Sequence, residues 1–271
     1  MDNKKNILIT GESGFIGSHL ITYFCNLYPH YLIHGLDSLT YASNRDYTKY
    51  LEEKKHYKFH QIDICNRERI MDLFMINKFT DVIHLAAESH VDNSIDYPLV
   101  FAQTNILGTL NLLDAFKKYS TGRFHHISTD EVYGDLNIDD SAFRENTPYN
   151  PSSPYSASKA ASDHFVRAYH RTYGINMTIT NCSNNYGPHQ HNEKFIPTII
   201  KSILTNSKIP IYGKGENIRD WLYVQDHVKA IDRVFHDGKS GNTYNIGGNN
   251  EISNINLVKH ICDICSDKGC H

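Results

Sequence analysis

The chain has 271 residues, a formal net charge of -3 at pH 7 and 40% hydrophobic residues. This length allows one large domain or two modest ones with a well-filled core. The slightly acidic balance argues against nucleic acid or an anionic membrane surface as a partner, and no apolar run approaches the ~20 residues that span a bilayer.

Apolar runs alternate with helical patterns from the start of the chain. We expect strands at residues 6–10, 31–36, 57–62, 81–85, 123–128 and 177–180. Helices are expected at residues 15–27, 67–74, 98–118 and 154–173. This alternation predicts an α/β fold with a Rossmann-like, doubly wound parallel sheet and right-handed crossovers.

The pattern becomes looser after residue 180. The segments 196–204, 209–213 and 220–223 are short, and Gly, Pro and Asn are frequent. A helix at 226–235 and a strand at 244–246 are expected to return to the main body. We therefore expect a dinucleotide-binding domain at 1–180 and a smaller substrate-binding lobe at 181–271.

Three glycines, Gly11, Gly14 and Gly17, stand between the first expected strand and the first expected helix. Glycines there let the backbone approach a pyrophosphate, which the helix N-terminus then faces. Asp37 ends the second strand, at the ~20-residue distance typical of a ribose-binding acid, and favours NAD over NADP. We expect the side chain of Glu12 to point to solvent, since an inward carboxylate would repel the pyrophosphate.

Tyr155 and Lys159 have the i, i+4 spacing that puts two side chains on one helix face. An ammonium beside a phenol lowers the phenol pKa, so we expect Tyr155 to accept a proton from a sugar hydroxyl. Asp130 and Glu131 end the preceding strand and offer an acid and a base. A Tyr base alone is enough to oxidise an alcohol, and the added carboxyl pair could also remove water.

The cysteines give no firm metal signal. Cys262, Cys265, Cys270 and His271 have a spacing that a metal site could use. Helical spacing of the apolar residues around Cys265 favours an ordinary helix, so no metal is expected. The scattered remaining cysteines and the lack of a secretory pattern at the N-terminus favour a cytoplasmic location.

These motifs together resemble the extended short-chain dehydrogenase/reductase superfamily and, within it, the nucleotide-sugar 4,6-dehydratases. The resemblance covers nearly the whole chain and rests on the glycine loop, the Tyr155–Lys159 pair and the stretches 85–95, 128–134, 181–188 and 209–221. It implies a lyase that converts dTDP-glucose to dTDP-4-dehydro-6-deoxyglucose and water, with NAD regenerated in each turnover.

The resemblance also implies roles for individual residues. The catalytic group would comprise Thr129, Asp130, Glu131, Tyr155 and Lys159. Tyr155 would take the proton of the sugar 4-hydroxyl, Glu131 would remove the C5 proton and Asp130 would protonate the departing 6-hydroxyl. Thr129 would bind the 4-oxygen, and Lys159 would hold the nicotinamide ribose.

The remaining implied residues bind the cofactor or the substrate. The NAD site would consist of Gly11, Gly14, Phe15, Ile16, Gly17, Asp37, Ser38, Leu39, Thr40, Asp63, Ile64, Leu85, Ala86, Ala87, Glu88, Ser89, Thr104 and Asn185, with Tyr155 and Lys159. The nucleotide sugar would contact Ser89, Asn184, Lys194, Phe195, Pro210, Ile211, Tyr212, Arg219 and Asn254.

Alternatives stay open at the level of sequence. A UDP-glucose 4,6-dehydratase differs by a few base contacts, and a UDP-sugar 4-epimerase shares the fold, NAD, Tyr and Lys but has no use for the two carboxyl groups. Family members usually continue well beyond residue 246, so the end at His271 leads us to expect weak turnover, and a non-catalytic dinucleotide-binding fragment is a further alternative. The helices at 98–118 and 154–173 resemble the family's dimer-forming pair, so we expect a homodimer.

Overall fold

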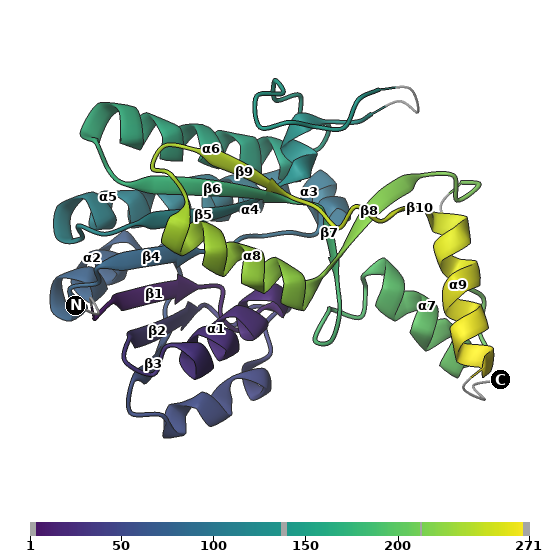
Figure 1. Ribbon diagram of the computed structural model, residues 1–271, viewed down its shortest axis with the longest axis horizontal. Coiled ribbons are helices and arrows are strands. Elements are labelled where there is room, and N and C mark those ends of the chain that lie inside the picture. Colours follow the sequence, from purple (N-terminus) through teal and green to yellow (C-terminus); the bar gives the residue numbers. More distant parts are fainter. Residues whose placement is uncertain (1–3, 137–139, 212, 268–271) are drawn as a thin grey trace.

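The computed structural model describes residues 4–136, 140–211 and 213–267 (Figure 1). Its centre is a seven-stranded sheet in the order β3-β2-β1-β4-β5-β6-β9, and every neighbouring pair is parallel. The strands are β1 (Asn6–Thr10), β2 (Leu32–Asp37), β3 (Tyr57–Gln61), β4 (Asp81–His84), β5 (Phe124–Thr129), β6 (Met177–Cys182) and β9 (Thr243–Ile246). The predicted doubly wound fold is confirmed.

Helices cover both faces of this sheet (Figure 1). One face packs against α2 (Arg67–Asn77), α5 (Thr109–Tyr119) and α6 (Pro154–Tyr173), and the other against α1 (Phe15–Leu27) and α8 (Val224–Asp237). Successive residues of β1 show why, because Leu8 belongs to the first core cluster while Ile7 and Ile9 belong to the second. The side chains of a strand alternate between its faces, so a strand buried on both sides is apolar throughout.

The helix expected at 98–118 has an irregular middle. It begins as α4 (Pro98–Phe101), widens into the π-helical segment η3 (Ala102–Gly108) and ends as α5. The short helix α3 (Val91–Asp96), which the sequence did not predict, precedes it. π-helical turns are rare, and those that occur are frequent at functional sites.

A smaller unit lies beside the carboxyl ends of the main strands, on the right of Figure 1. Its three-stranded sheet has the order β10-β8-β7, formed by β7 (Asn184–Tyr186), β8 (Ile218–Tyr223) and β10 (Glu251–Ser253). The helices α7 (Phe195–Leu204) and α9 (Asn254–Asp267) pack on each other there. The predicted returning helix and strand are present as α8 and β9, and the domain boundary at residue 180 stays a prediction.

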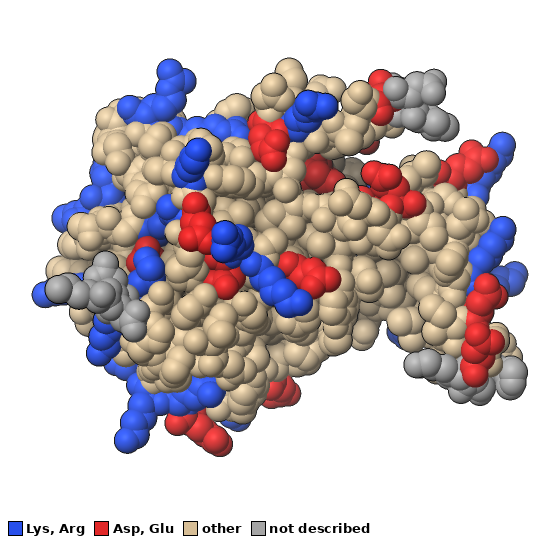
Figure 2. All heavy atoms as spheres, viewed as in Figure 1, with Lys and Arg blue, Asp and Glu red and all other residues tan. Residues whose placement is uncertain are grey.

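The cysteines near the end of the chain lie in an ordinary helix where the structure describes them. Cys262 and Cys265 lie on α9, as the apolar spacing favoured, whereas Cys270 and His271 lie outside the described residues. Among the described residues, no helix is long and apolar enough to cross a membrane. Basic and acidic side chains are interspersed on the face shown in Figure 2, where a hollow separates the small unit from the loop above it.

Candidate active site

The predicted site residues gather at one edge of the main sheet. The glycine turn follows β1, Asp37 ends β2, Asp63 and Ile64 follow β3, and residues 85–89 follow β4. The carboxyl ends of parallel strands share this edge, and the strand order reverses direction between β1 and β4. In doubly wound sheets a ligand binds in the crevice at such a reversal.

The turn after β1 has the shape that a pyrophosphate needs. Gly11 has φ +73, and a Cβ there would lie 2.8 Å from the backbone nitrogen of Ala86, while a Cβ on Gly17 would collide with the carbonyl oxygen of Gly11. No side chain of the described residues caps the N-terminus of α1 at Gly14. The first N–H groups of α1 therefore face the crevice as donors for an anion.

Asp37 organises the segment that follows β2. Its carboxylate accepts hydrogen bonds from the backbone N–H of Ser13 (3.0 Å) and Leu39 (2.8 Å) and from the hydroxyl of Ser43 (2.7 Å). Only 6% of Asp37 is exposed. A carboxylate oxygen can accept more than one bond, so Asp37 keeps capacity for a ribose hydroxyl, and the turn and this acid together fit a dinucleotide.

The expectation that Glu12 points to solvent is wrong. Glu12 is fully buried, and its carboxylate accepts bonds from Ser13 Oγ (2.8 Å), Thr48 Oγ1 (3.2 Å) and Tyr57 OH (2.9 Å). Arg45 lies 3.3 Å away. Burial raises the pKa of Glu12, while Ser13, Arg45 and Tyr57 act to lower it. These hydrogen bonds and the ion pair replace the water that the buried carboxylate has lost. The local sequence could not predict this orientation, because Thr48 and Tyr57 are distant from Glu12 in sequence.

The carboxyl pair follows β5 and begins the short helix η4 (Asp130–Tyr133). Thr129 links the pair, because its hydroxyl accepts from the Glu131 N–H (3.3 Å) and lies 3.4 Å from Asp130 Oδ1. Burial and the charge of Glu131 raise the pKa of Asp130 to about 7. Burial also raises the pKa of Glu131, but Arg219 and Lys194 oppose that rise. Both carboxyl groups therefore hold a proton more readily than they would in water, and Arg219 acts to lower the pKa of each.

Tyr155 lies on the first turn of α6 and shares this site. Burial raises the pKa of Tyr155 well above its ordinary value, and the charges of Glu131 and Asp130 add to the rise. The expected lowering by Lys159 is thus wrong for the protein alone. Lys159 instead donates a hydrogen bond to the carbonyl oxygen of Ile127, 2.8 Å away, and burial lowers its own pKa.

Behind Lys159 lies a buried network that sequence reasoning missed. Asp163, one turn along α6, accepts bonds from Ser128 Oγ (2.9 Å) and Tyr149 OH (2.8 Å), and His126 Nε2 lies 3.1 Å away. Burial alone would raise the pKa of Asp163, but His126 and Lys159 hold it below its ordinary value. The i, i+4 spacing of Lys159 and Asp163 was the available signal.

Asn105, in the π-helical segment, is a second functional residue that was missed. It accepts from the backbone N–H of Glu88 (2.8 Å) and donates to the Glu88 carbonyl (3.0 Å) and to Ser158 Oγ (2.8 Å). It is 1% exposed. Asn105 therefore joins the segment after β4 to the residue that precedes Lys159. The signal in the sequence was a polar residue, Asn105, within the apolar pattern of the predicted helix.

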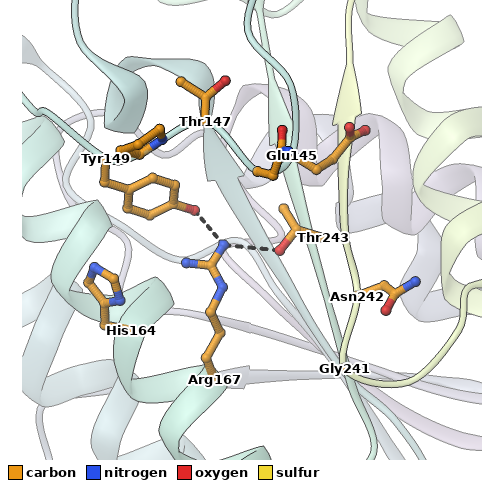
Figure 3. A pocket seen from close by; sticks show the side chains of 10 residues that line it. Glu145, Thr147, Tyr149, His164, Arg167, Gly241, Asn242 and Thr243 are labelled. Carbon is orange, nitrogen blue, oxygen red and sulfur yellow. Dashed lines mark hydrogen bonds between the residues drawn. The ribbon is translucent and has the colours of Figure 1, made fainter.

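A cavity of about 500 Å³ lies on the other side of this network (Figure 3). Arg167 of α6 points into it and donates to Tyr149 OH (2.7 Å) and to Thr243 Oγ1 (3.0 Å). Since Tyr149 also bonds Asp163, Arg167 braces the network from the cavity side. None of the predicted catalytic residues lines this cavity.

The predicted substrate residues divide into two groups. Lys194 and Arg219 lie close enough to Glu131 for their charges to act on it, and Lys194 Nζ also donates to the Ser89 carbonyl (3.3 Å). Asn184 and Asn185 lie on β7 and Phe195 begins α7. Asn254 begins α9, and its N–H donates to the Asn217 carbonyl oxygen (3.0 Å), while Pro210 and Ile211 precede β8 in the small unit and Tyr212 lies outside the described residues.

The chain has close known relatives. Residues 8–269 match the family described as GDP-mannose 4,6 dehydratase. A dTDP-glucose 4,6-dehydratase of Haemophilus influenzae is 51% identical over 271 residues, which cover 97% of this chain and 80% of the relative.

Among the described residues no cluster of His, Cys, Asp and Glu could hold a metal ion.

Solved structures extend the likeness. The crystal structure of a dTDP-glucose 4,6-dehydratase of Bacillus anthracis in complex with NAD has a TM-score of 0.89 and 41% identity, covering 97% of this chain and 81% of that one. A UDP-glucose 4-epimerase of Thermotoga maritima with UDP-glucose also has a TM-score of 0.89, at 29% identity, covering 96% of this chain and 82% of that one. The fold is therefore shared by both activities, and identity is higher with the dehydratase.

Proposed function

The chain belongs to the nucleotide-sugar 4,6-dehydratase family, and we propose that it converts dTDP-glucose to dTDP-4-dehydro-6-deoxyglucose and water with NAD as a resident cofactor. The carrying observation is the buried carboxyl pair beside Tyr155. Asp130, with a pKa of about 7, can hold a proton at neutral pH, while Arg219 and Lys194 oppose the rise that burial causes in the pKa of Glu131. Dehydration needs such an acid and such a base, whereas 4-epimerisation needs neither.

The first step is oxidation at C4. When bound, NAD supplies a hydride acceptor at C4 and later a hydride donor at C6. Tyr155 takes the proton of the 4-hydroxyl, and Thr129, which contacts Tyr155, bonds the resulting 4-oxygen. The high pKa of Tyr155 in the protein alone makes its phenolate a strong base, and a positively charged nicotinamide ring nearby favours that phenolate. Lys159, fixed on the Ile127 carbonyl, would hold the nicotinamide ribose.

The second step is elimination across C5 and C6. The 4-ketone acidifies the C5 proton, which Glu131 removes, and Asp130 protonates the departing 6-hydroxyl so that it leaves as water. Hydride is then returned to C6, and Glu131 returns its proton to C5. Tyr155 has gained one proton and Asp130 has lost one, so a transfer between them restores the site.

The binding residues follow the same proposal. The glycine turn and the open N-terminus of α1 would hold the pyrophosphate, and Asp37 the adenosine ribose. Residues 85–89, held by Asn105, would line the nicotinamide half. Lys194 and Arg219 would hold the substrate diphosphate, for which a guanidinium supplies paired donors.

The test is turnover by the purified chain loaded with NAD. Incubated with dTDP-glucose, it should give a 4-ketosugar, detected by the absorbance that alkali induces in such products. UDP-glucose in a parallel reaction should be converted more slowly. Formation of dTDP-galactose would identify an epimerase, and the absence of any product while NAD is bound would identify a non-catalytic protein; either result rejects the proposal.

We also propose that the chain forms a homodimer through α3, α4, η3 and α6. Large apolar side chains are exposed there, among them Ile95 (64%), Tyr97 (65%), Leu99 (76%), Leu107 (54%) and Phe165 (38%). Several large exposed apolar side chains on neighbouring helices indicate an interface between proteins. The helices lie side by side, since α3, α4 and η3 all contact α6.

A cytoplasmic location is a further part of the proposal. The cysteines of the described residues are free, including the buried Cys25 and Cys182, which suits a reducing compartment. Fractionation of cells that express the chain tests this directly. Recovery in a secreted fraction would contradict it.

A further inference from the structure

We propose that Glu12 is a positioning residue that sets the adenosine half of the cofactor site. The inference rests on the NAD site proposed above and concerns a residue that touches neither NAD nor substrate in that proposal. Glu12 stands inside the glycine turn, between Gly11 and Gly14, where its carboxylate would be unfavourable if it faced the pyrophosphate. The structure directs it the other way, into the protein.

The Glu12 carboxylate is the centre of a buried hydrogen-bond cluster, the hub, which also comprises Ser13, Arg45, Thr48 and Tyr57. Oε1 accepts from Ser13 Oγ and Thr48 Oγ1, with Arg45 Nη1 at 3.3 Å, and Oε2 accepts from Tyr57 OH. Glu12, Ser13 and Thr48 are completely buried, and Tyr57 is 4% exposed. Hydrogen bonds to a buried charge are stronger than those between neutral groups, so this hub holds its partners firmly.

The partners come from three separate segments. Ser13 belongs to the glycine turn, Arg45 and Thr48 belong to the segment that forms η1 (Arg45–Tyr47) and η2 (Lys49–Glu53), and Tyr57 begins β3. The segment 45–53 contains no long helix or strand to hold it by backbone bonds alone. Glu12 therefore fixes its position relative to the turn that would hold the pyrophosphate.

The residues directly before this segment are linked to Asp37, the acid that would bind the ribose. The Asn44 N–H donates to the Ser13 carbonyl (2.8 Å), and Ser43 Oγ donates to Asp37. The Ser13 N–H donates to the other oxygen of Asp37. Displacement of residues 44–48 would thus disturb two of the three supports of Asp37, namely Ser43, which directly precedes them, and Ser13, which Asn44 bonds, so the hub acts on the adenosine ribose through Asp37.

The strand beneath makes room for this hub. Gly35 of β2 lies directly under Glu12, and a Cβ there would be 2.7 Å from Glu12 Cγ. Arg45 closes the other side, with its guanidinium 4.0 Å from the centre of the Phe59 ring and an ion pair of 2.6 Å to Glu52. Glu52 is the outer partner of Arg45, since its side chain is 52% exposed and lies away from the turn.

Glu12 and Glu52 therefore form a matched pair for the experiment. Both bond Arg45, but only Glu12 also bonds the glycine turn and β3. The variants E12Q and E52Q are compared with the unaltered chain by isothermal calorimetry with NAD and with ADP-ribose, by thermal unfolding and by steady-state kinetics. ADP-ribose carries the adenosine half and the pyrophosphate without nicotinamide.

We expect E12Q to weaken NAD and ADP-ribose by the same factor, roughly tenfold. The KM for NAD should rise with it, while kcat at saturating NAD changes by less than about twofold. E52Q should leave both dissociation constants within about twofold. If E12Q does not fold, Y57F, which removes one bond from the carboxylate, replaces it and should weaken ADP-ribose by about threefold.

Three results would overturn the inference. The first is a variant of Glu12 or Tyr57 that is less stable but binds ADP-ribose normally, which would make the hub structural only. The second is equal weakening by E12Q and E52Q, and the third is a loss confined to kcat. Failure of the unaltered chain to bind NAD would instead reject the proposed function, so the two failures are distinguishable.

Discussion

Asp130 and Glu131 are neighbours at the end of β5, and the ionised Glu131 adds to the burial that raises the pKa of Asp130 to about 7. Burial raises the pKa of Glu131 as well, but two cations from the small unit, Arg219 and Lys194, oppose it. Arg219 acts to lower the pKa of both carboxyl groups, and Lys194 acts on Glu131. The chemistry we propose needs one of the two carboxyl groups to hold a proton while the other is ionised.

The first prediction concerns Asp130 as the general acid. Its pKa is raised, so it holds its proton below about pH 7 and loses it as the pH rises. We expect kcat to fall above about pH 7. In the D130N variant this fall of kcat above about pH 7 should be absent, and kcat should be lower by about 10²–10⁴-fold. NAD affinity should not change. An unchanged alkaline limb in D130N would assign that limb to another group.

The second prediction separates oxidation from elimination. E131Q should still oxidise C4 with Tyr155 as base, but it should not remove the C5 proton. Reduced nicotinamide should then accumulate on the enzyme after dTDP-glucose is added, visible in its absorbance. Y155F, the matched variant at the first step, should give no such signal. Equal behaviour of the two variants would contradict the assignment of their roles.

The third prediction concerns the buried network behind Lys159. D163N removes a charge that accepts bonds from Ser128 and Tyr149 and faces His126, so it should lower the free energy of unfolding by about 3 kcal/mol at pH 7. The pKa of Asp163 lies below its ordinary value in the folded chain. The contribution of the ionised Asp163 to the free energy of unfolding is therefore complete above about pH 4, and it is lost as the pH falls through the pKa of Asp163 in the folded chain.

The loss caused by D163N should accordingly shrink in acid, as measured by urea unfolding at pH 7, 4 and 3. The control is D226N, because Asp226 is 62% exposed and pairs with Lys229 on the surface of α8. It should change stability by less than about 0.5 kcal/mol. A loss for D163N that does not depend on pH would argue against a charge at Asp163.

The fourth prediction tests the dimer surface. Sedimentation of the unaltered chain should give the mass of two chains, and L99K should give the mass of one, since a buried unpaired ammonium opposes association. L204K is the control, because Leu204 on α7 is also exposed (66%) but lies in the small unit. A monomeric unaltered chain, or dissociation by L204K, would contradict the proposed interface.

Some elements could be predicted because their end signals are local. The bounds of α1 and α6 are the predicted ones. In α6, Ser153 forms a capping box with Ser156, Pro154 begins the helix and Gly174 follows its end in the left-handed conformation. The strands of the main sheet were also predicted to within one or two residues, and in β1 a short apolar run marks a strand that is buried on both faces.

Other features depend on contacts that are distant in sequence. The orientation of Glu12 is decided by Thr48 and Tyr57, so no local pattern could predict it. The π-helical segment contains Asn105, which bonds Glu88 and Ser158. The strands β7 and β10 have three residues each, which is too short for a periodic signal.

The candidate site could likewise be predicted only in part. The resemblance named the residues that would touch cofactor and substrate, but it did not name Asp163 or Asn105, which hold them. The i, i+4 spacing led us to expect that Lys159 lowers the pKa of Tyr155, whereas burial and the nearby carboxyl groups raise it in the protein alone. Burial of a side chain is a property of the assembled fold rather than of a motif.

The most direct test follows the hydrogen atom at C4. The chain is loaded with NAD and supplied with dTDP-glucose that carries deuterium at C4, and the product is analysed by NMR and mass spectrometry. We predict a 4-keto-6-deoxy product with the deuterium at C6, because the hydride removed from C4 is returned there after water has left. Deuterium that remains at C4, in the substrate or in a C4 epimer, would contradict internal transfer and with it the proposed dehydration.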